Sequence, residues 1–261
     1  DGSLMIDGGA VIPTGAQIAV TGNMGISNGG RLLLCSASAM SIAGCLSIDN
    51  GYAHVYEGSY IYIGENVSVH NAGENGFKAF NLSCIEVNWS VSLDNSECEA
   101  WSGAQIIIHR DYYDMDGSCL GIYSGSYMTA DDIYQENCKE PTYVYDQSSL
   151  SVEDTFTQSN GLGLIVSGYV NIHNDAILDY KVSSSNPAQF RLYSGNMRVG
   201  GDLCFYTEDT STLDNPHASR NYTIDLGVYD SAMLHCDGGA KIYADNIGLY
   251  DGQFKCDGDL H

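Results

Sequence analysis

Short segments in which apolar and polar residues alternate recur along the whole chain, and each closes on Asp, Asn or Gly. One of them is 46–50 (LSIDN), and the same pattern returns at 67–71 (VSVHN), 91–95 (VSLDN) and 170–174 (VNIHN). Alternation over four or five residues between turn residues predicts a strand with one buried side. No window carries apolar residues at helical spacing, so the chain is predicted to be all-β.

The segments recur at a nearly constant period. Those that begin at residues 4, 24, 46, 67 and 91 are 20, 22, 21 and 24 residues apart. Near the end of the chain, three segments follow one another directly at 239–246, 247–252 and 253–258. Such a period is typical of a solenoid in which each turn packs only on its neighbours. We therefore expect about 12 coils of 20–24 residues with three short strands per coil.

Three stretches interrupt the pattern, and we expect them to be loops inserted between strands. These are 77–89, 139–147 around Pro141, and 181–220 with its polar run at 207–215. Repeat folds tolerate such insertions on one side of the stack. No linker divides the chain, so a single β-solenoid domain is predicted for residues 1–261, as a fragment or repeat unit of a longer solenoid or fibre.

The residue that closes a segment should form a column along the solenoid, because residues one period apart stack on each other. Asn and Gly tolerate the left-handed conformation of a tight corner, and stacked amides can hydrogen-bond along the column. We therefore interpret this column as structural. Its members are Asn28, Asn50, Asn71, Asn95, Asn137 and Asn174.

With this column, its period and its three strands per turn, the chain resembles a known architecture. It is similar to the right-handed parallel β-helix of pectate-lyase-like proteins and of adhesin and autotransporter passenger domains. The right-handed form is expected because left-handed hexapeptide helices keep a stricter period. The resemblance covers nearly the whole chain, and it implies an architecture without specifying a function.

The charge of the chain limits its partners. There are 10 Lys and Arg against 33 Asp and Glu, a formal net charge of −23. Nucleic acids and anionic membrane surfaces would repel such a protein. The sequence also lacks an apolar run of about 18 residues, so no membrane span is predicted.

Acidic residues are expected to form a second column, one residue before the Asn column. Stacked carboxylates about 4.8 Å apart repel each other. Calcium would relieve this repulsion, because it takes carboxylate oxygens as ligands. The alternative is a solvated acidic edge with its side chains spread apart. The candidate calcium ligands are Asp94, Asp116, Glu136 and Glu153.

The nine cysteines include no C-x-x-C pair, which argues against a zinc ribbon. Cys98 and Cys119 are 21 residues apart, and Cys236 and Cys256 are 20 apart, which is one turn in each case. Each pair could form a disulfide between neighbouring turns or contribute to a buried stack of free thiols.

Four Asn-x-Ser/Thr sequons begin at Asn66, Asn81, Asn88 and Asn221. Glycosylation at any of them would require a secretory route. Together with the cysteine count, they predict an extracellular or cell-surface location.

Many β-helices of the kind that this chain resembles cleave acidic polysaccharides, so an enzymatic function is the alternative to a structural one. Those similar to pectate lyases use a basic residue beside calcium-binding carboxylates. Here Arg110 is the only Arg between residues 32 and 190, and the net charge would repel polyuronates. We therefore predict a non-catalytic structural or adhesive solenoid, a surface stalk or filament subunit. The alternative is a lyase or glycoside hydrolase acting on acidic glycans.

Two features indicate the kind of partner. The unpaired strand edges at solenoid ends can recruit further strands, which favours self-association end to end. Outward tyrosines could stack on sugar rings or on a protein partner. The expected partners are another copy of the chain or a host or cell-surface glycan or protein. The tyrosines considered are Tyr60, Tyr62, Tyr123, Tyr127 and Tyr243.

Overall fold

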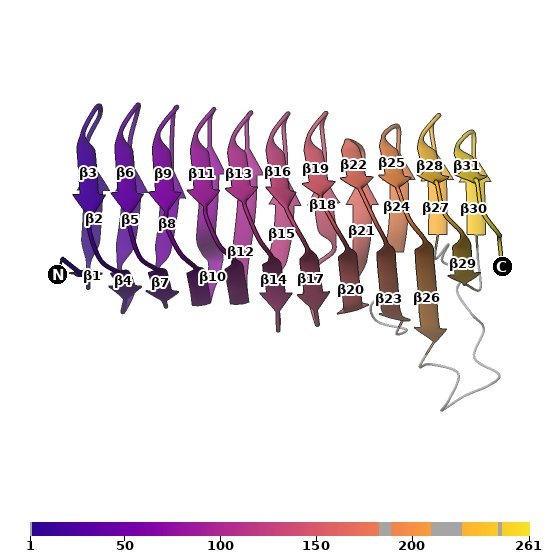
Figure 1. Cartoon of the computed structure of the whole chain (residues 1–261), viewed down its shortest axis with the longest axis horizontal. Coiled ribbons are helices and arrows are strands. Elements are labelled where there is room, and N and C mark those ends of the chain that lie inside the picture. Colours follow the sequence, from indigo (N-terminus) through magenta and orange to yellow (C-terminus); the bar gives the residue numbers. More distant parts are fainter. Residues whose placement is uncertain (1, 183–188, 210–225, 245–246) are drawn as a thin grey trace.

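The chain folds into a β-solenoid. The computed structural model describes residues 2–182, 189–209, 226–244 and 247–261. This part of the chain contains 31 strands and no helix. Parallel strands stack along one long axis with the N-terminus at one end and the C-terminus at the other (Figure 1). The all-β solenoid is thus confirmed, with about 10 turns instead of the expected 12.

Each turn contributes three strands, and strands of the same kind stack in register. The first strand of each turn forms the first face of the solenoid. Its members are β1 (Leu4–Ile6), β4 (Met24–Ser27), β7 (Leu46–Asp49), the start of β10 (Val67–Phe80), the start of β12 (Val91–Trp101), β14 (Tyr112–Met115), β17 (Ile133–Glu136), β20 (Phe156–Gly161), β23 (Ala176–Val182), β26 (Leu203–Asp209) and β29 (Ala240–Tyr243).

The second face follows the first at a corner, and strands β10 and β12 each extend across that corner, with shifts in register between them. It comprises the ends of β10 and β12 together with β2 (Gly9–Ile12), β5 (Arg31–Leu34), β8 (Tyr52–Val55), β15 (Cys119–Ile122), β18 (Thr142–Val144), β21 (Gly163–Val166), β24 (Gln189–Tyr193), β27 (Leu226–Tyr229) and β30 (Ile247–Tyr250).

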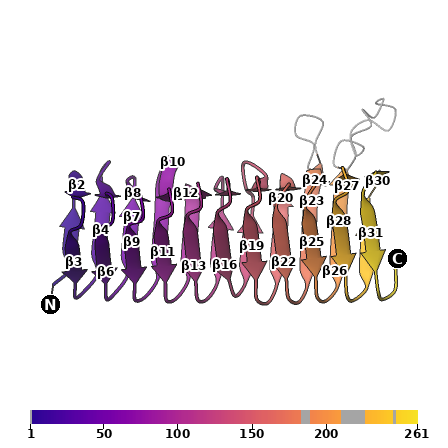
Figure 2. The same cartoon turned by 90° about the horizontal axis from the view of Figure 1, so that it is seen from above.

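The third face is a separate sheet of 11 strands, flat and regular along the whole rod (Figure 2). Its strands are β3 (Gln17–Val20), β6 (Ala39–Ile42), β9 (Tyr60–Ile63), β11 (Cys84–Val87), β13 (Gln105–Ile108), β16 (Tyr127–Ala130), β19 (Ser149–Val152), β22 (Tyr169–Ile172), β25 (Asn196–Val199), β28 (Met233–Cys236) and β31 (Gln253–Cys256).

The alternating pattern of the sequence builds the interior. Each short strand directs every second side chain inward, so three strands close an apolar shaft. In the third turn, which contains the segment 46–50, all six inward side chains are fully buried. They are Leu46, Ile48, Ala53, Val55, Ile61 and Ile63.

A column of left-handed residues lies at the corner between the first and second faces. Amide side chains link some neighbours, as where Asn137 donates to Asp116 (3.0 Å) and accepts from Asn160 (3.2 Å). Asn174 was wrongly placed in this column. It follows β22 on the third face, and Asn160 is the member at that turn. The described members are Asn28, Asn50, Asn71, Asn95, Asp116, Asn137 and Asn160.

All three stretches that were expected to be inserted loops contain strands. The register between β10 and β12 shifts between His70 and Phe77, so the extra residues precede the predicted stretch 77–89. The stretch 139–147 contains β18, and 181–220 contains β24, β25 and β26. Pro187, Pro216 and most of the polar run 207–215 lie outside the described residues.

Polar side chains interrupt the apolar shaft along one seam. Asp114, Gln135 and Gln158 occupy successive inward positions of the first face and are all buried. Gln135 Nε2 donates to Asp114 Oδ2 (2.9 Å), and Gln158 Nε2 donates to Gln135 Oε1 (3.1 Å). Thr142 also donates to Gln135 Oε1 (2.6 Å). This seam ties three turns together inside the solenoid.

Candidate functional site

Aromatic residues stack along one edge of the second face, where each strand ends and the chain turns toward the third face. Phe80 pairs with Trp101, and Tyr193 pairs with Tyr229. The other members follow from the register of the residues before them. We call this set the aromatic column, and its members are Tyr56, Phe80, Trp101, Tyr123, Tyr145, Tyr193, Tyr229 and Tyr250.

Four pairs of neighbouring rings in the column stack on each other. The ring centroids lie 4.9 Å apart for Tyr56 and Phe80, and 4.0 Å apart for Trp101 and Tyr123. Tyr229 lies 5.0 Å from Tyr193 and 5.2 Å from Tyr250. Stacking of this kind holds the rings in fixed positions, because each ring loses its freedom to rotate against its neighbour. The rings are half-buried, apart from the exposed ring of Tyr250.

The local sequence explains how the rings fit. Gly121 lies two residues before Tyr123, and Gly227 lies two residues before Tyr229, on the outward side of the same strand. A Cβ atom added to Gly121 would lie 2.3 Å from the Tyr123 ring, and one added to Gly227 would lie 2.4 Å from the Tyr229 ring. The two glycines therefore leave the space into which these rings lean.

Charged groups flank the column on the same face. Lys78 is 8% exposed and its Nζ lies 2.8 Å from Glu97 and 2.6 Å from Glu99. Burial lowers the pKa of Lys78, but hydrogen bonds to both carboxylates outweigh it and the pKa is raised. Trp101 Nε1 donates to Glu99 (3.1 Å), and Lys139 lies 3.7 Å from Glu97. The cluster is thus a neutralised ion-pair network beside the rings.

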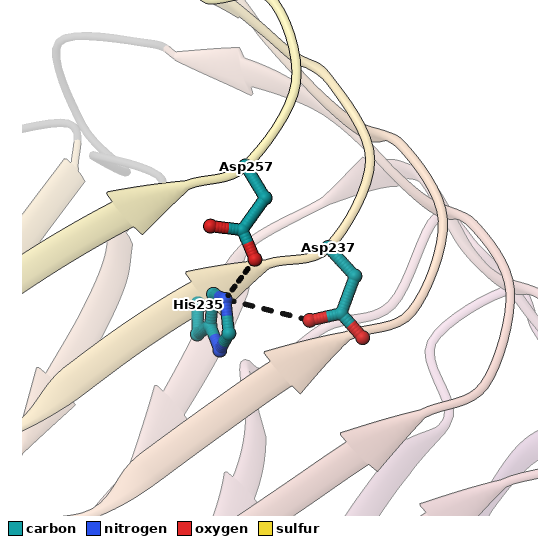
Figure 3. Close-up of side chains that lie close together, drawn as sticks. All are labelled: His235, Asp237 and Asp257. Atoms are coloured by element: carbon teal, nitrogen blue, oxygen red, sulfur yellow. Dashed lines mark hydrogen bonds and ion pairs between the residues drawn. The ribbon is translucent and has the colours of Figure 1, made fainter.

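A second cluster lies on the third face near the C-terminal end (Figure 3). His235 Nε2 lies 3.4 Å from Asp237 Oδ1 and 3.1 Å from Asp257 Oδ2. In the described part of the chain, these three side chains form the one group spaced as metal ligands would be. Lys255 Nζ, however, lies 2.8 Å from Asp257 and 3.0 Å from His235, and Arg198 binds Asp237. Both carboxylates are already neutralised, so we interpret this cluster as a surface ion-pair network.

The four candidate calcium ligands do not lie together. Asp94 and Glu136 belong to one column of the first face, but Met115 separates them, and Asp116 lies one position later in the column of corner residues. Glu153 follows β19 on the third face. The expected column was wrong because a shift of one residue in register moves a side chain to a different column.

Asp94 and Glu153 have histidine neighbours instead of carboxylates. His70 Nδ1 lies 3.6 Å from Asp94 Oδ2, and His173 Nδ1 lies 3.4 Å from Glu153 Oε2. Asp116 accepts the amide of Asn137. These groups are parts of the solenoid surface and its corner.

All nine cysteines are unpaired. Cys98 stacks on Leu120, whereas Cys119 stacks on Glu97, so the first candidate pair is out of register by one residue. Cys236 and Cys256 do occupy paired positions, but both thiols are free. Of the two interpretations, disulfides between turns or free thiols, the structure agrees with free thiols. Cys98, Cys119 and Cys236 are buried.

The sequon asparagines of the described residues are exposed. Asn66 and Asn88 lie at corners after third-face strands, where Asn66 Oδ1 accepts Ser90 N–H (3.1 Å) and Asn88 Nδ2 donates to Gly64 (3.2 Å). Asn81 is left-handed and directly follows the ring of Phe80. The fourth sequon, at Asn221, lies outside the described residues.

The tyrosines selected from the sequence do not form one surface. Tyr60, Tyr62 and Tyr127 lie on the third face, and Tyr243 lies on the first. Only Tyr123 belongs to the aromatic column. The signal for the column was present in the sequence, because Trp101, Tyr123 and Tyr145 are each 22 residues apart. It was missed because the strands of the second face were not aligned with one another.

Comparison with known proteins adds no relative. A scan against family models, a search of curated proteins and a search of solved structures each found no match. The resemblance to pectate-lyase-like and adhesin domains is therefore supported only as far as the β-solenoid architecture itself. Among the described residues, no helix is long and apolar enough to cross a membrane.

Proposed function

We propose that this chain is a non-catalytic, extracellular adhesive solenoid that binds neutral glycans along its aromatic column. The observation that carries the proposal is the column itself. Eight of the nine positions from Tyr56 to Tyr250 hold an aromatic side chain at the same edge of the second face. An ordered line of half-buried rings suits a long, repetitive ligand, because aromatic rings pair an apolar body with a polar tip.

The net charge of −23 favours neutral glycans over acidic ones, because a polyanion would be repelled along the whole rod. The exposed sequons at Asn66, Asn81 and Asn88 support an extracellular location. The cysteine count does not add to this support, because the thiols are free and therefore do not indicate an oxidising compartment.

The ion pairs beside the column favour binding over catalysis. A glycosidase needs two carboxyl groups with different protonation states, one of them free to donate a proton. Glu97 and Glu99 instead share the ammonium of Lys78, whose raised pKa keeps it charged. The alternative of a lyase or glycoside hydrolase on acidic glycans would need this network to open.

A retention assay tests the proposal. The protein is incubated with insoluble cellulose, chitin, mannan and xylan, and with cross-linked polygalacturonate as the acidic counterpart. We expect retention on at least one neutral polymer, little on polygalacturonate, and no new reducing ends in the supernatant. Retention on none of the neutral polymers would overturn glycan adhesion, and a steady release of reducing ends would make the protein an enzyme.

A second candidate function is end-to-end self-association, and it has its own observation. The strands of the first turn (β1–β3) and the strands β30 and β31 of the last turn pair with a neighbouring strand on one side only. The edge of β29 is covered by residues 259–261. Apolar side chains are exposed there, including Met5 (69%), Ile247 (53%) and Leu249 (52%). Such edges accept either another copy or further turns of a longer chain. Fibres one solenoid wide in electron micrographs would support stacking, and discrete rods at high concentration would exclude it.

A further inference from the structure

The aromatic column has one position without a ring. Ser167 occupies it, because the residue before it, Val166, pairs with the residues that directly precede Tyr145 and Tyr193. Ser167 N–H donates to the Val144 carbonyl of the preceding turn (2.8 Å), as Tyr145 N–H donates to Ile122 one turn earlier, so the backbone continues the stack. The missing ring is therefore a substitution within a regular column.

The corner of the chain is also shorter at this turn. Four residues, 145–148, connect β18 to β19, whereas only residues 167–168 connect β21 to β22. The two left-handed residues Asp146 and Gln147 have no counterpart. A Cβ added to Gly168 would lie 2.2 Å from the carbonyl oxygen of Ser148, so the backbone packs directly on the previous turn. Both the side chain and the backbone withdraw from the surface here.

Aromatic walls border this turn on both sides. The ring of Tyr145 stacks on Tyr143 (5.5 Å), and the ring of Tyr193 stacks on Tyr229 (5.0 Å) at the next turn toward the C-terminus. These contacts hold both walls in place and leave them separated by the Ser167 turn. We call the space bounded by Tyr145, Ser167 and Tyr193 the ring slot.

The width of the ring slot follows from the strand spacing. Tyr145 and Tyr193 are two strand steps apart, or about 9.6 Å. A flat ring in van der Waals contact with both walls needs about 7–8 Å. A saturated sugar ring is puckered and carries axial hydrogens, so it is thicker and fills the slot better than a flat ring. Ile165, half-buried and outward on the same strand, lies one outward position before Ser167, between Tyr143 and Arg191.

From this geometry we propose that the ring slot binds one neutral pyranose unit of a polysaccharide. The inference rests on the proposed function and assigns its principal subsite. The apolar C–H groups of the sugar ring contact the walls, and its hydroxyl groups reach the Ser167 hydroxyl and water. The neighbouring rings of the column then contact the flanking sugar units less closely.

Filling the slot tests the assignment. Ser167→Tyr completes the column, and Cys35→Tyr is the matched control, because Cys35 lies in the column position before Tyr56 and extends the column without closing a gap. Binding of cellohexaose, mannohexaose and chitohexaose is measured by calorimetry, and folding by circular dichroism. For the sugar that binds, we expect Ser167→Tyr to raise Kd by roughly tenfold or more, and Cys35→Tyr to leave it within about twofold.

A second pair of variants covers a folding defect in Ser167→Tyr. Tyr193→Ala removes one wall, and Tyr62→Ala removes a ring of the third face, outside the column. We expect the first to weaken binding about tenfold and the second to have little effect. Equal effects of both would overturn the ring slot as the principal subsite.

The outcomes separate this inference from the proposed function. If the wild-type protein binds a hexasaccharide and Ser167→Tyr binds it equally well, the ring slot is wrong while glycan adhesion stands. If the wild-type protein binds none of the polymers or hexasaccharides, both are wrong. If wild-type dimers seen by sedimentation dissociate in Ser167→Tyr, a side chain of a second copy occupies the slot, which also overturns the sugar assignment.

Discussion

At the scale of single residues, one buried carboxyl group stands out. Asp114 is fully buried in the polar seam, and no Lys, Arg or His is among its hydrogen-bond and ion-pair partners in the described residues. Burial raises its pKa to about 7, and the hydrogen bond from Gln135 counters this only in part. Asp114 is therefore protonated in the folded state over a pH range in which it ionises in the unfolded chain.

This gives a direction for the pH dependence of stability. The pKa of Asp114 in the folded state lies above its unfolded value of 3.8. The group therefore does not lower the free energy of unfolding at low pH, and it lowers it progressively as the pH rises from about 4 to 7. Above pH 7 this loss in the free energy of unfolding, relative to low pH, amounts to about 4 kcal/mol. We expect Asp114→Asn to melt at a higher temperature than wild type at pH 8, and the gap to close toward pH 4.

The control is Asp49→Asn at an exposed first-face position, which should change the melting temperature little at either pH. A wild-type stability that rises between pH 4 and 7 in step with that of Asp114→Asn would show that Asp114 is not a buried neutral acid.

At the scale of strands and corners, most of the fold was predictable from the sequence and the register was not. The alternation in 46–50 specifies a strand and the period specifies stacking, because both follow from local sterics and burial. The segment 170–174 has the same alternation, yet it forms part of the third face. Alternation identifies a strand without identifying its place in the turn, so Asn174 and Glu153 were assigned to the wrong columns.

The candidate site was missed for a related reason. A binding surface of a solenoid is made of residues from many turns, and a shift of one residue changes the column in which each belongs. The aromatic column becomes visible only when Trp101, Tyr123 and Tyr145 are aligned by their pairing. The ring slot depends further on the shortened corner at Ser167 and Gly168, whose length no repeat period specifies.

The corner column makes its own prediction. Asn137 has a left-handed backbone (φ 55°), and its side-chain amide hydrogen-bonds to both neighbours in the column. Asn174 is not among the left-handed residues of the described chain. We expect Asn137→Ala to lower the free energy of unfolding by about 1–2 kcal/mol. Asn137→Gly should cost less than Asn137→Ala, because glycine adopts this conformation without strain.

At Asn174 the order of the two substitutions should reverse. Asn174→Gly should lower the free energy of unfolding more than Asn174→Ala, because glycine adds conformational entropy to the unfolded chain and relieves no strain in the folded one. Urea unfolding of the four variants checks both orders. If alanine proved the better replacement at Asn137, the left-handed conformation would not be what selects asparagine at this corner.

At the scale of the whole molecule, neighbouring turns of the solenoid are held against each other by noncovalent contacts. The ten steps of the third face give a rod of roughly 50 Å, and no disulfide joins its turns, because all nine cysteines are free. Interior contacts therefore carry the stability: the apolar shaft, the polar seam and the corner hydrogen bonds.

The free thiols can be counted directly. We expect mass spectrometry to find nine alkylated cysteines after denaturation without reductant, and dithiothreitol to leave the melting temperature unchanged. Seven or fewer alkylated cysteines, together with a lower melting temperature in dithiothreitol, would mean that disulfides join the turns.

Hydroxyl-radical footprinting tests the central claim, glycan binding along the aromatic column, most directly. Oxidation of each tyrosine is measured by mass spectrometry with and without the neutral polysaccharide that retains the most protein. We expect Tyr145 and Tyr193 to be protected, while Tyr60 and Tyr127 on the third face oxidise at unchanged rates. Protection of the third-face tyrosines, with Tyr145 and Tyr193 unaffected, would contradict it.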